Sequence, residues 1–168
     1  MLVFDIRSVE AKAVQVDAEL SPDDAVWQSG DPVPAHPLRV TGRLSAAGGG
    51  GGRFYWHGRV AGDITLPCRR CLADATVHVQ DEAHVIFAEA GSDESEDPDV
   101  YVLEERSNQL DLRPVIREQW MLNAPAFAEC RPDCKGICPT CGKDLNEGPC
   151  ECPASRDARW DALRKLQS

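Results

Sequence analysis

The chain has 168 residues, a formal net charge of −10 and eight cysteines. This length accommodates one domain of ordinary size plus a small appendage, and it suffices to bury a core without disulfide bonds. The apolar stretches are far shorter than the roughly 20 residues that span a bilayer, and charges interrupt the N-terminal stretch where a signal peptide needs an apolar core. These features predict a cytoplasmic protein with reduced thiols and no membrane association.

Charge is distributed unevenly along the chain. Residues 39–72 contain six arginines and one aspartate, a net charge of +5, whereas residues 81–105 contain ten acidic residues and neither Lys nor Arg. The overall acidity argues against a generally basic nucleic-acid-binding protein. The basic segment nevertheless offers a local surface for an anionic partner, and the acidic segment offers one for a basic protein.

Alternating apolar and polar residues predict the strands, because successive side chains of a strand point to opposite faces. Short connections favour antiparallel pairing of consecutive strands. Four prolines in residues 21–37 predict a long connection, and the five glycines of residues 48–52 predict the tip of a hairpin. The predicted strands cover residues 12–20, 40–44, 53–66, 77–87 and 100–103.

Helices are predicted only late in the chain. Asp111 is a suitable N-cap for a first helix that ends before Pro125, and a second helix begins near Ser155. Between the strands, residues 91–99 are poor in apolar side chains and rich in like charge, which predicts a disordered loop. The predicted inner face of the first helix consists of Val115, Ile116, Gln119 and Leu122.

These elements predict an α+β fold with three parts. Residues 1–125 form a mainly antiparallel β-sheet domain closed by one helix. Residues 126–154 form a cysteine-rich, zinc-binding segment, and residues 155–168 form the C-terminal helix.

The tail CRPDCKGICPTCGKDLNEGPCEC predicts a metal site. In Cys138-Pro-Thr-Cys141-Gly, two thiolates lie across a tight turn and can face one ion while backbone N–H groups stabilise their charge. Zinc is the expected metal, although tetrahedral thiolate sites also accept iron. The alternative, a set of reduced surface thiols, would expose them to oxidation. The tail cysteines are Cys130, Cys134, Cys138, Cys141, Cys150 and Cys152.

A further cysteine pair, Cys68-Arg-Arg-Cys71, follows the long strand. A thioredoxin-type redox pair would precede a helix, whereas strand alternation resumes here, which favours two zinc ligands. One division of the eight cysteines joins Cys68 and Cys71 to Cys130 and Cys134 and leaves the other four as a second site. A single site, built from Cys138 and Cys141 with two other tail cysteines, is the simpler alternative.

The sequence predicts no enzyme and no small-molecule substrate. The four histidines lack a partner motif for catalysis. The glycine run lacks the Lys-Ser or Lys-Thr pair and the strand-to-helix context of a phosphate-binding loop.

One strand face is basic. Arg53, His57 and Arg59 alternate with apolar residues, and Tyr55 lies among them. Such a surface can bind phosphate and stack a base, and Arg69 and Arg70 of the CRRC turn are further candidates. The alternative is a solvated outer face of a half-buried sheet.

The sequence resembles the YceD family, the large ribosomal RNA subunit accumulation proteins. The resemblance rests on LPCRRCL at residues 66–72, on LDLRPVIREQWMLNAP at residues 110–125 and on the cysteine tail, in that order. It covers most of the chain after about Arg39. The five glycines depart from it as a local insertion.

The resemblance implies a non-enzymatic role in the accumulation or processing of large-subunit (23S) ribosomal RNA, that is, in ribosome biogenesis. The expected partner is this rRNA or its precursor, and the charge of the acidic loop provides the alternative, capture of a basic ribosomal protein. A thiol redox protein that uses Cys68 and Cys71 remains the alternative from another functional class.

Overall fold

The computed structural model describes residues 1–48, 52–103 and 107–153. It divides into two compact units, of which the first contains residues 1–65 and 76–126 and the second contains residues 66–75 and the tail from Phe127. The helix predicted from Ser155 lies outside the described residues. In the part of the chain that is described, no helix is long and apolar enough to cross a membrane.

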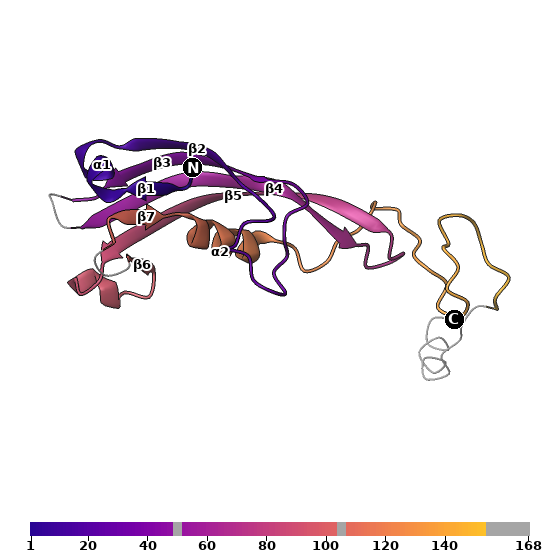
Figure 1. The fold of residues 1–168 in the computed structure, drawn as a ribbon. Coiled ribbons are helices and arrows are strands. Elements are labelled where there is room, and N and C mark those ends of the chain that lie inside the picture. The colour runs from indigo at the N-terminus through magenta and orange to yellow at the C-terminus, as the bar shows by residue number, and fades with distance from the viewer. Residues whose placement is uncertain (49–51, 104–106, 154–168) are drawn as a thin grey trace, which may run out of the picture. The chain divides into compact units, whose positions relative to one another are not determined.

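The first unit is built on a five-stranded sheet with the strand order β2-β3-β4-β5-β6 (Figure 1). The pair β2–β3 and the pair β3–β4 are antiparallel, as predicted. Each strand buries nearly every second side chain on one face, which is the consequence of the alternating sequence. The strands are β2 (Val14–Leu20), β3 (Leu38–Ala46), β4 (Arg53–Pro67), β5 (Asp74–Glu89) and β6 (Val100–Leu103).

The edge strand β6 runs parallel to β5, with Ile86 opposite Val100. The prediction that consecutive strands are antiparallel is therefore wrong at this edge. The connection between the two strands is long enough to carry the chain back along β5 before β6 begins. It contains a short 3-10 helix, η1 (Asp93–Glu96), where the sequence predicted only a disordered loop.

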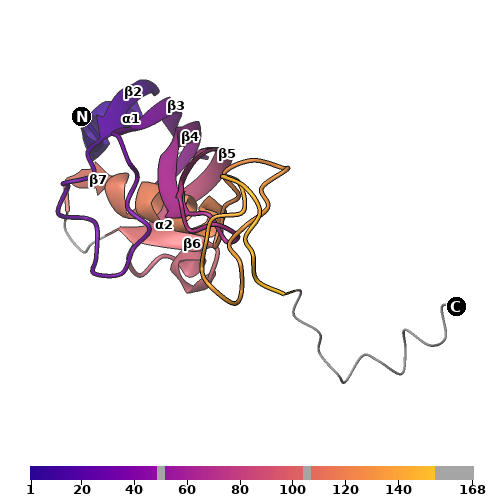
Figure 2. The ribbon, with the colours of Figure 1, turned by 90° about the vertical axis from the view of Figure 1, so that its right-hand side faces the viewer.

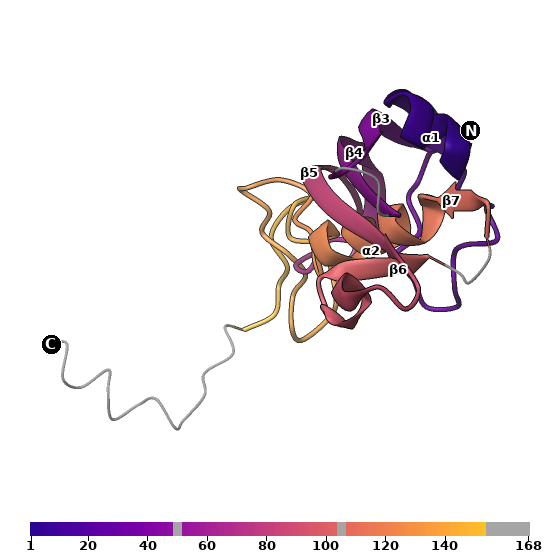
Figure 3. The same ribbon diagram turned by 90° about the vertical axis from the view of Figure 1, so that its left-hand side faces the viewer.

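The sequence reasoning missed three short elements: β1 (Val3–Asp5), α1 (Ile6–Ala11) and β7 (Gln109–Asp111). β1 pairs with β7 in a small antiparallel sheet. The carboxylate of Asp5 accepts the backbone N–H of Ser8 at 2.9 Å and so caps α1. Figures 2 and 3 show that α1, the β1–β7 pair and α2 lie on the same side of the five-stranded sheet.

The helix α2 (Arg113–Asn123) lies against this face and closes the core (Figures 1 and 3). It begins two residues after the predicted cap, although Asp111 still accepts the N–H of Arg113 at 2.9 Å. Trp120 is buried and Leu122 is 70% exposed, which corrects the predicted inner face. The helical period places Trp120 above Ile116 and turns Leu122 outward.

The second unit has a small apolar interior. Its backbone is held by isolated bridges, between Cys68 and Ala128 and between Ile137 and Asp144. Within residues 66–75 and 127–153, its buried apolar side chains belong to small residues, and three of them are thiols: Cys68, Ala75, Ala128, Cys134 and Cys138.

Candidate metal centres and a basic surface groove

Four cysteines from distant parts of the sequence come together in the second unit. Their sulfur atoms all lie within 4.8 Å of one another. The Sγ atoms of Cys68 and Cys134 are 3.9 Å apart, and those of Cys71 and Cys130 are 3.6 Å apart. This arrangement, the first cysteine set, can hold one tetrahedral metal ion. Its members are Cys68, Cys71, Cys130 and Cys134.

A tight turn at the end of β4 positions the first two of these thiols. The N–H of Leu72 donates to the carbonyl of Cys68 at 2.9 Å, and Leu72 itself has a left-handed backbone with φ of 64°. The N–H of Cys68 also donates to Ala73 at 2.8 Å. Backbone N–H groups, first those of Cys130 and Cys71, lower the pKa of the Cys68 thiol to about 6. These N–H groups, from the tail and from the turn, therefore favour a thiolate, which is the form that binds metal.

Both arginines of the CRRC turn contact neighbours in the same unit. The guanidinium of Arg69 pairs with Glu129 and lies 5.4 Å from the centre of the Phe127 ring. Arg70 donates to the carbonyl of Cys134 at 2.9 Å. These contacts tie the turn to the tail on either side of the first cysteine set.

The other four cysteines form the second cysteine set, whose sulfur atoms also lie within 4.8 Å of one another. At its knuckle, the N–H of Gly142 donates to the carbonyl of Cys138 at 2.8 Å, and Gly142 has a φ of +72°. The N–H groups of Cys141 and Thr140 lower the pKa of the Cys138 thiol to about 6. The members of this set are Cys138, Cys141, Cys150 and Cys152.

Each set also contains a thiol that resists ionisation. Burial, followed by the interaction with Cys71, raises the pKa of Cys130 to about 12. Contact with Cys141 and then burial raise the pKa of Cys152 to about 12. Crowded thiolates repel one another, so only a cation among them lets all four ionise. The two sets thus have the chemistry of metal sites.

The predicted basic face lies on the outer side of β4, in the first unit. The phenol of Tyr55 hydrogen-bonds Nδ1 of His84 at 2.6 Å, and Nε2 of His57 contacts Glu82 at 2.9 Å. Arg59 projects from the same exposed face. Arg53, at the start of β4, is half-buried.

A shallow groove of about 300 Å³ crosses this face between β3 and β4. Arg43 lies opposite His57 and Thr41 opposite Arg59 in the strand register. We call it the arginine groove. The sequence reasoning did not select Arg43, Glu82 or His84, because their positions beside His57 depend on strand pairing that the sequence does not specify. The polar and charged residues that line the groove are Gln15, Thr41, Arg43, His57, Arg59 and Glu82.

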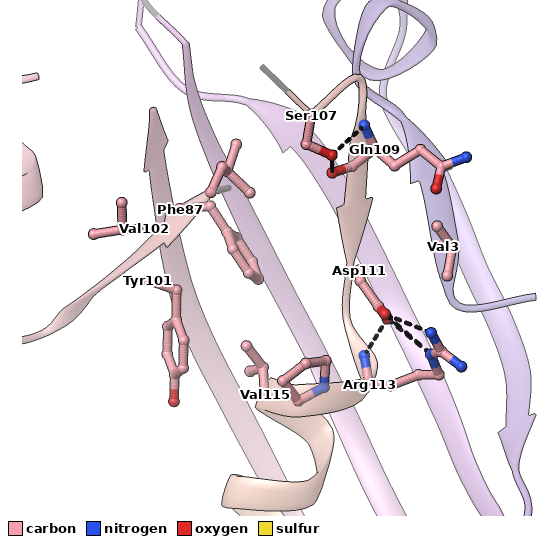
Figure 4. A pocket seen from close by; sticks show the side chains of 11 residues that line it. Val3, Phe87, Tyr101, Val102, Ser107, Gln109, Asp111, Arg113 and Val115 are labelled. Carbon is pink, nitrogen blue, oxygen red and sulfur yellow. Dashed lines mark hydrogen bonds and ion pairs between the residues drawn. The ribbon is translucent and has the colours of Figure 1, made fainter. Parts of the chain in front are cut away.

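A second hollow, of about 350 Å³, lies between β6 and the start of α2 (Figure 4). Phe87, Tyr101 and Val115 give it an apolar wall. At its polar end the guanidinium of Arg113 and the carboxylate of Asp111 bind each other, with a closest contact of 2.7 Å. Since these two charges neutralise each other, the hollow presents little net charge to a ligand.

Sequence comparison places the chain among known proteins. The model of the family described as "Large ribosomal RNA subunit accumulation protein YceD" matches residues 56–167. The chain belongs to the YceD family. The match includes all eight cysteines, so both cysteine sets fall within the part of the chain that defines the family.

The chain is also similar to individual proteins. The uncharacterized protein YlbN from Bacillus subtilis is 24% identical over 98% of this chain and 94% of its own length. Rv2926c from Mycobacterium tuberculosis and Mb2951c from Mycobacterium bovis are each 34% identical over 65% of this chain, which spans 53% of their length. No solved structure matches the chain.

Proposed function

We propose that the protein is a non-enzymatic ribosome biogenesis factor that large-subunit (23S) rRNA needs in order to accumulate, and that two structural zinc ions order its second unit. The observation that carries this proposal is the family match, which spans both cysteine sets. The family description supplies the link to large-subunit rRNA. The proximity of the sulfur atoms supplies the argument for metal.

The small interior of the second unit supports a structural role for zinc. Among its described residues, those that are buried and apolar are alanines and cysteines, which remove little apolar surface from water. A structural zinc contributes on the order of 10 kcal/mol or more in peptides without a core. Two such ions would supply the stability that this small apolar interior does not. Zinc is favoured over iron because zinc is not redox-active, and a purely structural site needs no redox chemistry.

The arginine groove is the proposed contact with the rRNA or its precursor. In the described part of the chain, Arg43 and Arg59 have no ion-pair partner, so both charges remain available for phosphate oxygens. Tyr55, half-buried on the same strand, adds a ring that can stack a base. Arg53, Arg69 and Arg70 remain further proposed contacts.

Depletion of the protein in its native organism tests the function. We expect sucrose gradients to show fewer large subunits and an excess of free small subunits, with a loss of large-subunit rRNA relative to small-subunit rRNA. An unchanged gradient and an unchanged rRNA ratio would overturn the proposal.

Two alternatives are tested separately, one in the depleted strain and one with the purified protein. Rescue by Cys68→Ser protein would exclude a thiol redox function that depends on this cysteine. In the second alternative, the purified protein binds a basic ribosomal protein and no RNA. If deletion of residues 91–99 then abolishes the binding of that protein, the acidic segment is the contact.

A further inference from the structure

A third group of metal-ligating side chains lies outside the cysteine sets, on the exposed face of the first unit. His57, Glu82 and His84 each place a ligand atom within 4.8 Å of the others. We propose that these three residues form a separate binding site for a divalent transition-metal ion such as zinc. This site does not depend on the proposed ribosomal function or on metal in the cysteine sets.

The sheet itself brings the three ligands together. Glu82 and His84 are two residues apart on β5, so their side chains share one face, and His57 reaches the same face from the neighbouring strand β4. The two imidazole rings stack with centroids 4.3 Å apart. Backbone pairing thus brings the three groups together, and one ring must turn out of the stack for both imidazole lone pairs to meet one ion.

The distances suit a metal ion. Nε2 of His57 and Oε1 of Glu82 are 2.9 Å apart, bridged by a proton. Two ligands on a tetrahedral zinc, with bonds near 2.0–2.1 Å, are about 3.3 Å apart. An ion can therefore replace the shared proton after a small widening of the contact. Two imidazoles and a carboxylate are a donor set that first-row divalent ions accept.

Tyr55 orients the second histidine. Its hydroxyl lies 2.6 Å from Nδ1 of His84. A tyrosine hydroxyl can accept as well as donate, so it can accept a hydrogen bond from Nδ1–H of His84, which leaves the Nε2 lone pair free for the ion. Metal-bound histidines commonly have such a partner on their other nitrogen, and it raises their basicity as ligands.

The site is open to solvent, which predicts moderate affinity. The side chains of His57 and Glu82 are 45% and 58% exposed. Three protein ligands leave a fourth coordination position for water or an anion. This differs from the cysteine sets, where four thiols can close the coordination sphere.

Zinc titration of the full-length protein, monitored by the imidazole nitrogen resonances, tests the site. The cysteine sets are saturated with zinc before the titration begins, so that the added zinc reports only on further sites. We expect one equivalent beyond that point to bind and to shift the resonances of His57 and His84. His84→Ala or Glu82→Gln should weaken this binding by about tenfold or more.

His78→Ala is the matched control. His78 lies on the same strand as His84 and hydrogen-bonds Asp63 at 2.8 Å, and it belongs to none of the three-ligand groups among the described residues, so we expect zinc binding to be unchanged in this variant. The proposal is overturned if zinc leaves the His57 and His84 resonances in place. It is also overturned if His78→Ala weakens binding as much as His84→Ala does.

Discussion

The Sγ atoms of Cys68 and Cys134 lie 3.9 Å apart, although the two residues are 66 positions apart in the chain. One cysteine follows β4 and the other belongs to the tail, and both are buried. A shared metal ion would cross-link these two segments, because each segment would supply two of its four ligands.

The first prediction concerns metal content. Protein purified under reducing conditions should hold two equivalents of zinc, and Cys134→Ser should hold about one equivalent less, because a serine hydroxyl is a poor zinc ligand. Elemental analysis measures this directly. Cys150→Ser is the matched variant in the second cysteine set and should lose the other equivalent. Wild-type protein with intact thiols and no metal would contradict both expectations.

The second prediction separates the two units. The double variant Cys138→Ser/Cys141→Ser should lose order mainly in the second unit, because the first unit has its own core around Trp56 and Trp120. Hydrogen exchange should show faster exchange in residues 127–153 and unchanged protection in β3, β4 and α2. Tryptophan emission from the core should stay the same. Loss of protection throughout the sheet would show that the units do not fold independently.

The third prediction tests the arginine groove. Replacement of Arg43 and Arg59 together by Glu should weaken binding to large-subunit rRNA across sequences, and it should lower the salt-dependence slope by roughly two units. Filter binding over a range of salt concentrations gives both values. The control is the double variant Arg7→Glu/Arg39→Glu, which changes the net charge by the same amount but alters exposed arginines outside the groove. Of these two, Arg39 pairs with Asp17 at 3.1 Å. If both double variants lose the same amount of rRNA affinity, the effect comes from overall charge and not from the groove.

The fourth prediction concerns pH. Two hydrogen bonds from Arg117, of 2.6 and 2.8 Å, hold Asp31, and together with the N–H of Gln28 they lower the pKa of its carboxyl. The folded state therefore gains stability from this charge above the unfolded pKa of about 3.9, and loses it as the pH falls through the lower folded pKa. Asp31→Asn should reduce the urea midpoint near neutral pH.

The difference between Asp31→Asn and wild type should shrink as the solution is acidified below about pH 4, since the wild-type carboxyl then becomes neutral as well. Asp17→Asn is the control, because its pair with Arg39 is exposed and should contribute about 0–1 kcal/mol. A difference that stays constant down to acid pH would assign the effect to packing instead of charge.

Local patterns predicted the parts of the fold that depend on local chemistry. Alternation located β2, β4 and β5 because one face of each strand is buried. The direction of β6 depends instead on the path of the connection before it. The strands β1 and β7 have three residues each, too few to show a period.

The site shows the same division. The spacing of Cys138 and Cys141 indicates a knuckle by itself, whereas the grouping of Cys68 with the tail cysteines was only one of two divisions that the sequence allowed. The position of Arg43 opposite His57 depends on the register of a hairpin whose glycine tip carries no pattern. Long-range pairing thus marks the limit of what a single sequence predicts.

The ratio of large- to small-subunit rRNA in cells that carry a replaced copy of the gene tests the central claim most directly. Wild-type protein should restore the ratio that deletion lowers, whereas the double variant Cys134→Ser/Cys150→Ser, which disrupts both cysteine sets, should leave it low. Immunoblotting shows that both proteins are present in equal amounts. A normal ratio in the deletion strain, or full rescue by the double variant without bound zinc, would contradict the account.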